Sequence, residues 1–209
     1  MNILKLFADY PFIPSFLDSG KEITDIVYDS RKARPDTIFV AMRGANRDGH
    51  DSCMNAYENG CRDFVVEHRV TLPNDAITYL VADSRRALSV MSRSLFQFTP
   101  KEEKKLVPTQ LIAVTGTKGK TSTCMILRSI LEAAGRKVGY IGTLGVMYDG
   151  KVLETPNTTP ESYEIFRHLR QMRLSGCEYV LIEASSQGVK LHRTADLCFN
   201  LRVFTNLSP

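Results

Sequence analysis

Short apolar runs and helically spaced apolar positions alternate along the whole chain. Apolar runs bounded by polar or glycine residues predict buried strands, and apolar residues three and four positions apart predict amphipathic helices. In the first hundred residues the pattern predicts strands at Ile23–Tyr28, Thr37–Ala41, Asp63–Glu67 and Thr78–Ala82. It also predicts helices over about Asp51–Asn59 and Ser84–Phe98, with Asp83 as N-cap of the second. The second helix is expected to bury Ala87, Leu88, Met91, Leu95 and Phe98.

The second half of the chain shows the same alternation of strand and helix patterns. Strands are predicted at Leu111–Thr115, Val138–Ile141, Val146–Tyr148, Val152–Glu154, Tyr179–Ala184 and Leu201–Thr205. Tyr179–Ala184 and Leu201–Thr205 are both expected to be buried. Helices are predicted over about Lys120–Ala134 and from Pro160 to about Leu174. This order favours an α/β fold with a doubly wound, mostly parallel sheet, which binds ligands at the carboxyl ends of its strands.

Local signals refine these elements. Gly135 is expected to stop the helix that starts at Lys120, and Asp149-Gly150 predicts a tight hairpin turn. That helix is expected to turn inward Thr123, Ile126, Leu127, Ile130, Leu131 and Ala134. The later helix carries a helically spaced set that we interpret as core rather than as a cofactor box: Ile165, Phe166, Leu169 and Met172.

A charged stretch with prolines at both ends, Thr99–Thr109, predicts an exposed linker. We therefore expect a small α/β domain over residues 1–100, a linker over 101–109 and a second domain over 110–209. The chain stops just after a predicted strand, at Asn206–Pro209, where a domain seldom ends. From this we expect a piece of a longer protein.

Composition narrows the class of protein. The apolar fraction of 43% is typical of a soluble globular chain, and the net charge of +4 comes from scattered residues, which does not favour a nucleic-acid partner. No run of 18 apolar residues predicts a membrane span. The five cysteines form no C-x-x-C pair, so free thiols in a reducing cytoplasm are expected. The four histidines are too scattered along the chain to predict a metal cluster, and only His50 is a candidate for ligand contact.

The stretch Leu111–Thr123 carries the strongest chemical signal. It predicts a buried strand, a glycine loop over Gly116–Gly119, and a helix that opens at Lys120. Two glycines let the backbone turn tightly, and the free N–H groups of a helix start attract phosphate. Lys120 can contact the β- and γ-phosphates, and the Thr121 hydroxyl can ligate Mg²⁺. The predicted nucleotide-binding set is Gly116, Thr117, Lys118, Gly119, Lys120, Thr121 and Ser122. The alternative is a glycine turn without a ligand.

Three further segments place polar residues where a ligand could bind. Asn157, Thr158 and Thr159 precede a predicted helix, a position that suits a phosphate or carboxylate but also a simple helix cap. Glu183 ends a buried strand and is our second metal candidate beside Thr121. In the first domain, Ser30 can bond a phosphate, and the N–H groups of residues 45–47 can line an anionic pocket.

These motifs together resemble the Mur ligases, amide-forming enzymes of peptidoglycan precursor synthesis. Val114 stands where the general P-loop has its first glycine, but T-G-T-K-G-K-T at Thr115–Thr121 is similar to the shorter ATP loop of that family. Tyr28-Asp29-Ser30-Arg31, with the strand and turn up to His50, resembles the UDP-binding domain of the tripeptide-forming type. The segment Asn157–Pro160 resembles the muropeptide-binding segment of that type.

The resemblance implies a specific reaction. An ATP-dependent ligase with Mg²⁺ would add a free amino acid to UDP-N-acetylmuramoyl-L-Ala-D-Glu through an acyl phosphate. Lys120 and Glu183 would be catalytic, and Thr121 and Glu183 would hold the metal. The implied substrate contacts are Tyr28, Ser30, Ala45, Asn46, Arg47, Asn157, Thr158, Thr159, Ser185 and Arg193. A monomer in the cytoplasm is expected.

Some residues depart from the family pattern, and other assignments stay open. Gln187 stands where many relatives have histidine, and Leu191 where several have glutamine, which affects the expected substrate contacts. The family's carbamylated lysine and C-terminal domain would lie beyond Pro209, so this chain alone is not expected to complete the reaction. The alternatives are a MurF-like ligase, a folate-type ligase, and a non-catalytic nucleotide-binding module.

Overall fold

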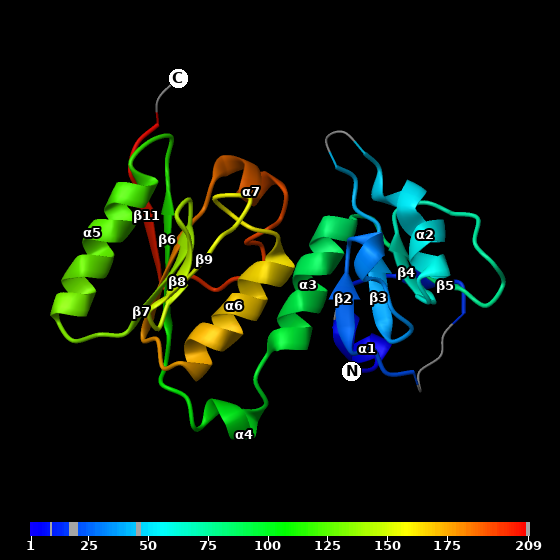
Figure 1. Ribbon diagram of the computed structural model, residues 1–209, viewed down its shortest axis with the longest axis horizontal. Coiled ribbons are helices and arrows are strands. Elements are labelled where there is room, and N and C mark those ends of the chain that lie inside the picture. The colour runs from blue at the N-terminus through cyan, green and yellow to red at the C-terminus, as the bar shows by residue number, and fades with distance from the viewer. Residues whose placement is uncertain (9, 17–20, 45–46, 208–209) are drawn as a thin grey trace. The chain divides into compact units, whose positions relative to one another are not determined.

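The computed structural model describes residues 1–8, 10–16, 21–44 and 47–207. The chain forms two compact units, Met1–Leu95 and Phe96–Pro209 (Figure 1). Among the described residues, none of the helices combines the length and the apolar character that crossing a bilayer requires.

Unit 1 is built on a five-stranded sheet with the order β1-β5-β4-β3-β2. Its strands are β1 (Ile13–Pro14), β2 (Asp25–Val27), β3 (Thr37–Val40), β4 (Asp63–Val66) and β5 (Ile77–Leu80). Strands β2 to β5 run parallel, and β1 pairs antiparallel with β5. Every residue of β3 and β4 is buried, as expected for central strands that are covered on both faces. All four strands predicted here are confirmed.

Unit 1 has one helix ahead of its first strand, and its other helices and 3₁₀ turns follow strands. They are α1 (Ile3–Phe7), the 3₁₀ turns η1 (Ser30–Lys32) and η2 (Gly49–Ser52), α2 (Cys53–Glu58) and α3 (Ser84–Phe96). The helix predicted over residues 51–59 is thus divided between η2 and α2. The N-cap prediction for α3 is confirmed, because the Asp83 carboxylate accepts the Arg86 N–H at 2.9 Å.

Unit 2 contains a six-stranded sheet with the order β11-β6-β10-β7-β8-β9. Its strands are β6 (Gln110–Thr115), β7 (Val138–Gly142), β8 (Gly145–Tyr148), β9 (Lys151–Leu153), β10 (Tyr179–Glu183) and β11 (Leu201–Phe204). The first four in the sheet run parallel, and β8 and β9 extend it as an antiparallel hairpin. Asp149 and Gly150 both have positive φ, 51° and 72°, which confirms the predicted turn.

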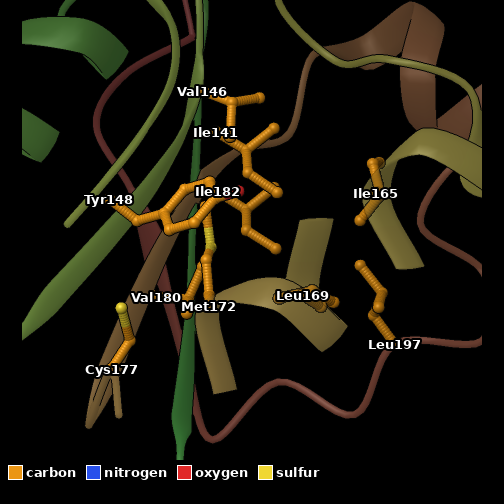
Figure 2. Close-up of a cluster of buried hydrophobic side chains, with 10 residues drawn as sticks. All are labelled: Ile141, Val146, Tyr148, Ile165, Leu169, Met172, Cys177, Val180, Ile182 and Leu197. Atoms are coloured by element: carbon orange, nitrogen blue, oxygen red, sulfur yellow. The ribbon is translucent and has the colours of Figure 1, made fainter. Parts of the chain in front are cut away.

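Helices α5 and α6 lie on opposite faces of the unit 2 sheet, and this unit also contains the short helices α4 and α7 (Figure 1). The four helices of unit 2 are α4 (Pro100–Glu103), α5 (Lys120–Ala133), α6 (Ser162–Leu174) and α7 (Ser186–Lys190) in the part of the chain that the structure describes. Leu181 of β10 joins the core cluster that contains Cys124 of α5, whereas its neighbours Val180 and Ile182 join the cluster under α6. Figure 2 shows this second cluster, in which Ile165 and Leu169 come from α6. The core interpretation of the α6 residues is confirmed, and the fold class is the one predicted.

Two burial predictions in unit 2 are wrong. Ile126 and Ile130, expected to face inward, are 60% and 59% exposed, and Ala134 is exposed too. Strand β11 is also largely exposed, with Phe204 at 63%. An apolar pattern does not reveal whether a neighbour covers a residue, and this applies to the exposed face of α5 as well as to β11, which is the edge strand of the described sheet. Pro160 precedes the N-cap Glu161 of α6 and so lies just outside its first turn.

Part of the predicted linker is helical. Thr99 and Glu102 form a capping box at the start of α4, and Glu102 and Glu103 make ion pairs of 2.9 Å and 2.6 Å to arginines of α6. Hydrogen bonds from Thr99 hold the pKa of Glu102 below its ordinary value. The division into residues 1–100, 101–109 and 110–209 stays a prediction.

The burial of the thiols generates the first testable prediction. Cys53, Cys61, Cys124 and Cys177 are buried, whereas Cys198 is exposed. Burial raises the pKa of Cys53 and of Cys124 to about 12, and the thiolate is the reactive form. A chromogenic disulfide reagent at neutral pH should therefore titrate one fast thiol in the native protein, and Cys198→Ser should abolish that phase. A second fast thiol would contradict the packing of at least one unit.

Candidate functional site

The glycine loop joins a central strand to a helix, as predicted. Strand β6 ends at Thr115, the loop covers Gly116–Gly119, and α5 begins at Lys120. Gly119 caps the helix at φ +81°, a conformation that residues with a Cβ rarely adopt. At Gly116 a Cβ would lie 2.1 Å from the Thr205 hydroxyl, so only glycine fits there. Both glycines are therefore needed by the shape of the loop itself.

Lys120 and the N-terminus of α5 give the region beside the glycine loop a positive electrostatic potential. The Lys120 ammonium lies over the loop and donates to the Gly116 carbonyl at 2.7 Å. The first N–H groups of an α-helix have no partner inside the helix, and the helix dipole adds a partial positive charge there. A cavity of about 300 Å³ opens at this point and is lined in part by Gly116, Thr117, Lys120 and Ser185. The site can accept an anionic group.

Glu183 is the central residue of the site. It ends β10, its side chain is fully buried, and it makes no ion pair with a described cationic residue. Hydroxyl groups surround its carboxylate instead. Thr121 and Thr143 each donate to Oε2 at 3.1 Å, and Tyr140 donates to Oε1. Burial, then the bond to Glu183, raises the pKa of Tyr140, so the phenol stays protonated and remains a donor.

The residues at Glu183 fit a magnesium ion. Mg²⁺ prefers oxygen ligands, and the carboxylate and the Thr121 hydroxyl are 3.1 Å apart. A buried carboxylate without a cationic partner is costly, and a bound cation removes that cost. The sequence prediction that Thr121 and Glu183 lie side by side is correct in its geometry, and their role as metal ligands stays a prediction.

The segment around residues 157–159 lies next to Glu183. The Thr158 and Thr143 hydroxyls are 3.1 Å apart, whereas Asn157 is exposed. Thr159 is buried, and its hydroxyl donates to the Glu183 carbonyl at 2.8 Å. The same hydroxyl oxygen accepts the Ser185 N–H at 3.0 Å. The structure therefore brings this segment and Ser185 to the carboxyl edge of the sheet.

Arg193 is tied to the same segment. Its guanidinium donates to the Thr159 carbonyl at 2.8 Å and forms an ion pair of 2.7 Å with Glu161. Only 9% of the residue is exposed. Its visible role is to fix the turn ahead of α6, and direct contact with a substrate remains a prediction.

A second group of predicted residues lies at the carboxyl edge of the unit 1 sheet. Tyr28 and Ser30 follow β2, and the turn from Arg43 to Asp48 follows the adjacent β3. Ser30 begins η1, and the Gly44 N–H donates to the Arg47 carbonyl at 2.9 Å. Arg47 is exposed. Ala45 and Asn46 lie outside the described residues.

Histidines that are far apart in the sequence meet at this edge, which corrects the expectation that they are too scattered. The rings of His50 and His68 stack with centroids 4.0 Å apart, beside Asp48. Both ring nitrogens of His50 already have hydrogen-bond partners, because Nδ1 bonds Asp48 at 2.5 Å and Nε2 accepts the Glu67 N–H at 2.9 Å. The hydrogen bond from the His50 backbone N–H is the main cause that lowers the pKa of Asp48. The cluster thus fixes the turn, and it offers little for a metal.

Sequence reasoning missed four residues of the unit 2 site. Tyr140 and Thr143 contact Glu183, and Thr205 and Asn206 contact the glycine loop. The signal that could have found the last two is their position directly after a parallel strand next to β6. Tyr140 gave no such signal, because an aromatic residue in a strand is ordinarily core. A larger cavity, of about 540 Å³, lies in unit 1 beside Ser15 and Phe16, and no predicted site residue lines it.

These features define an α/β protein with a glycine loop between a central parallel strand and a helix. A model described as "Mur ligase family, catalytic domain" matches residues 22–102, and one described as "Mur ligase middle domain" matches residues 114–209. Together the two models match most of the sequence. The chain belongs to the Mur ligase family.

Curated relatives show which type of Mur ligase the chain is similar to. The UDP-N-acetylmuramoyl-L-alanyl-D-glutamate–2,6-diaminopimelate ligase of Clostridium botulinum is 35% identical over 211 residues, covering 100% of this chain and 42% of that protein. The ligase of the same name from Clostridium perfringens is 36% identical over 200 residues, covering 96% of this chain and 40% of that protein. The chain thus spans about two fifths of the length of these relatives.

Solved structures share the fold. A structure of a UDP-N-acetylmuramoyl-L-alanyl-D-glutamate–2,6-diaminopimelate ligase aligns with a TM-score of 0.79 at 22% identity, covering 100% of this chain and 40% of that one. MurF ligase from Thermotoga maritima, in complex with ADP, aligns with a TM-score of 0.56 at 22% identity, covering 89% of this chain and 38% of that one. The fold prediction is confirmed.

The contact between Tyr140 and Glu183 generates a prediction about stability. Tyr140→Phe removes the donor to the buried Oε1 of Glu183 and also the acceptor of the Leu144 N–H, which is only partly buried. Removing a hydroxyl donor from a buried carboxylate should lower the free energy of unfolding by about 1–3 kcal/mol, measured by urea unfolding. Tyr148→Phe is the matched control, because Tyr148 is also buried but its hydroxyl bonds no described residue. Equal effects of the two changes would contradict the assigned role of the Tyr140 hydroxyl.

Proposed function

We propose that this chain carries the UDP-sugar-binding and ATP-binding parts of a ligase that extends UDP-N-acetylmuramoyl-L-Ala-D-Glu by one amino acid in peptidoglycan synthesis. The observation that carries the proposal is the glycine loop placed beside a buried carboxylate that has no cationic partner among the described residues. The names of the relatives support diaminopimelate as the added amino acid. We place the protein in the cytoplasm, as a monomer, where its thiols stay reduced.

ATP is proposed to bind with its phosphates at the start of α5. The N–H groups of Gly119 to Ser122 supply the anion-binding donors, and Lys120 approaches the γ-phosphate by a change of side-chain rotamer. The N–H groups of Thr117 and Lys118 are already bonded to Asn206, so these residues shape the loop. The MurF ligase of Thermotoga maritima, which shares the fold, was solved in complex with ADP, and this supports a nucleotide as the ligand.

Magnesium is proposed to complete the site, held by Thr121 and Glu183. When bound, the ion would neutralise negative charge on the phosphoryl group that is transferred. Tyr140 and Thr143 orient the Glu183 carboxylate by donating to it, so the side chain needs no rearrangement to accept a cation.

The proposed reaction has two transfers. A carboxylate oxygen of the muramoyl dipeptide attacks the γ-phosphorus of ATP, and ADP leaves. The amine of the amino acid then attacks the acyl carbon, inorganic phosphate leaves, and the amine loses a proton as the amide forms. In this scheme Thr158, Asn157 and Ser185 position the dipeptide near the phosphates, since they lie at the same sheet edge as Glu183.

The UDP group is proposed to bind at the carboxyl edge of the unit 1 sheet. Tyr28 and Ser30 come from one loop, and Arg47 from the turn after β3, with Ala45 and Asn46 expected to complete it. The ion pairs of Arg43 with Asp48 and Glu67, at 3.7 Å and 3.3 Å, support the base of that turn. An exposed arginine beside backbone N–H groups suits a diphosphate.

The test of this function uses two reciprocal substitutions. Lys120→Ala should weaken ATP binding about ten- to a hundredfold, because a charge-assisted contact is worth about 1.5–3 kcal/mol. The same variant should bind UDP-N-acetylmuramoyl-L-Ala-D-Glu as the unaltered protein does. Ser30→Ala should show the opposite pattern, with weaker UDP-muramoyl binding and unchanged ATP binding. Calorimetric titration measures both ligands.

The two variants control each other, since each must fold well enough to keep the ligand of the other unit. Unchanged ATP affinity in Lys120→Ala would remove the nucleotide assignment of the glycine loop. Unchanged UDP-muramoyl affinity in Ser30→Ala would show that the unit 1 site is wrongly placed.

A further inference from the structure

Two residues directly after β11, Thr205 and Asn206, are bonded to the glycine loop along most of its length. We refer to this pair as the loop anchor. Strand β11 runs parallel to β6, with Phe204 opposite Thr115, so the chain leaves both strands side by side. Neither residue is among the site residues predicted from the sequence.

The Asn206 side chain pairs with both backbone polar groups of Lys118. Its Oδ1 accepts the Lys118 N–H at 3.1 Å, and its Nδ2 donates to the Lys118 carbonyl at 3.0 Å. The Asn206 backbone carbonyl also accepts the Thr117 N–H at 3.1 Å. A primary amide is suited to this pairing because it presents a donor and an acceptor together, whereas an ionised carboxylate only accepts.

Thr205 adds further hydrogen bonds to the loop and to the strand before it. Its hydroxyl donates to the Lys118 carbonyl at 2.7 Å and lies 3.2 Å from the Thr115 carbonyl. Its backbone N–H donates to the same Thr115 carbonyl at 2.9 Å. The hydroxyl occupies the space where a side chain at Gly116 would lie. The loop and the anchor are therefore complementary in shape as well as in hydrogen bonding.

These bonds decide which donors of the loop remain for an anion. Because the N–H groups of Thr117 and Lys118 point to Asn206, the donors left are those at the start of α5 and the Lys120 ammonium. A four-residue loop with two glycines has many accessible conformations, and fixing one of them costs conformational entropy. Contacts that fix the loop before the ligand arrives remove that cost from binding.

We propose that Thr205 and Asn206 are positioning residues, which hold the glycine loop in its phosphate-binding conformation. The proposal rests on the proposed nucleotide site and extends it by making the end of β11 part of the binding apparatus. The competing explanation is that the two residues only stabilise the edge of the sheet.

Asn200 offers a matched control for that explanation. It lies at the opposite end of β11, where its Oδ1 accepts the Leu111 N–H at 2.8 Å and its own N–H donates to the Leu111 carbonyl at 2.9 Å. Asn200 thus makes the same kind of side-chain bond to β6, but away from the glycine loop. Loss of either asparagine side chain removes an edge contact, and only loss of Asn206 affects the loop.

The experiment compares Asn206→Ala with Asn200→Ala in the full chain. We expect Asn206→Ala to weaken ATP binding about tenfold and to speed hydrogen exchange at the Lys118 amide. Asn200→Ala should leave both unchanged and instead speed exchange at the Leu111 amide. Urea unfolding reports the stability that each variant loses. Equal ATP affinity in the two variants, with unchanged exchange at Lys118, would overturn the proposal.

The role of the Thr205 hydroxyl is tested by comparing a variant that lacks the hydroxyl with one that keeps it. Thr205→Val keeps the shape but puts a methyl group against two carbonyls, and should weaken ATP binding severalfold, whereas Thr205→Ser should restore it. Equal weakening by Val and Ser would overturn the role of the hydroxyl. If the unaltered protein binds no ATP, the proposed function fails, and exchange at the Lys118 amide still decides whether Asn206 holds the loop.

Discussion

A buried carboxylate needs hydrogen-bond donors or a cation around it, and the central buried carboxylate of unit 2 is that of Glu183. No described cationic side chain pairs with it, so three hydroxyl groups donate to it instead. Those donors come from the start of α5, from β7 and from the residue after β7. Through Thr143 the network reaches Thr158, and the Glu183 carbonyl accepts from Thr159. One residue, through its carboxylate and its backbone carbonyl, thus fixes the relative positions of the segments that would bind nucleotide and dipeptide.

The glycine loop is held on two sides by different chemistry. On the side of β10, Thr121 reaches the Glu183 carboxylate. On the side of β11, Thr205 and Asn206 bond the loop backbone. Since β6 lies between β10 and β11 in the sheet, the loop that follows it is enclosed by the ends of both neighbours. Because the three strands are parallel and adjacent, the segments that follow them meet at the same edge of the sheet, and this sets the position of the site.

Local patterns made much of this fold predictable. The loop at Gly116–Gly119, the turn at Asp149-Gly150 and the buried face of α6 each depend on residues close in sequence. Thr121 and Glu183 were also predicted together, because polar residues at the ends of parallel strands converge at one edge.

The failures involve partners that are distant in the chain. The exposure of Ile126 and of β11 depends on what covers them, which an apolar pattern does not contain. Tyr140 meets Glu183 across 43 positions, and Asn206 meets Lys118 across 88. The stacking of His50 on His68 likewise depends on the pairing of β3 with β4. Residue type suggested core or surface for these side chains, and only the sheet topology reveals their contacts.

The central claim is that Glu183, Thr121 and the start of α5 form one metal–nucleotide site. Its most direct test is paramagnetic line broadening of backbone amide signals by Mn²⁺ with ATP, since Mn²⁺ uses the same oxygen ligands as Mg²⁺. The account predicts that broadening is strongest at Thr121, Thr143 and Glu183 and requires the nucleotide for its full extent. Broadening centred on the Asp48–His50–His68 cluster of unit 1, or absent around Glu183, would contradict it.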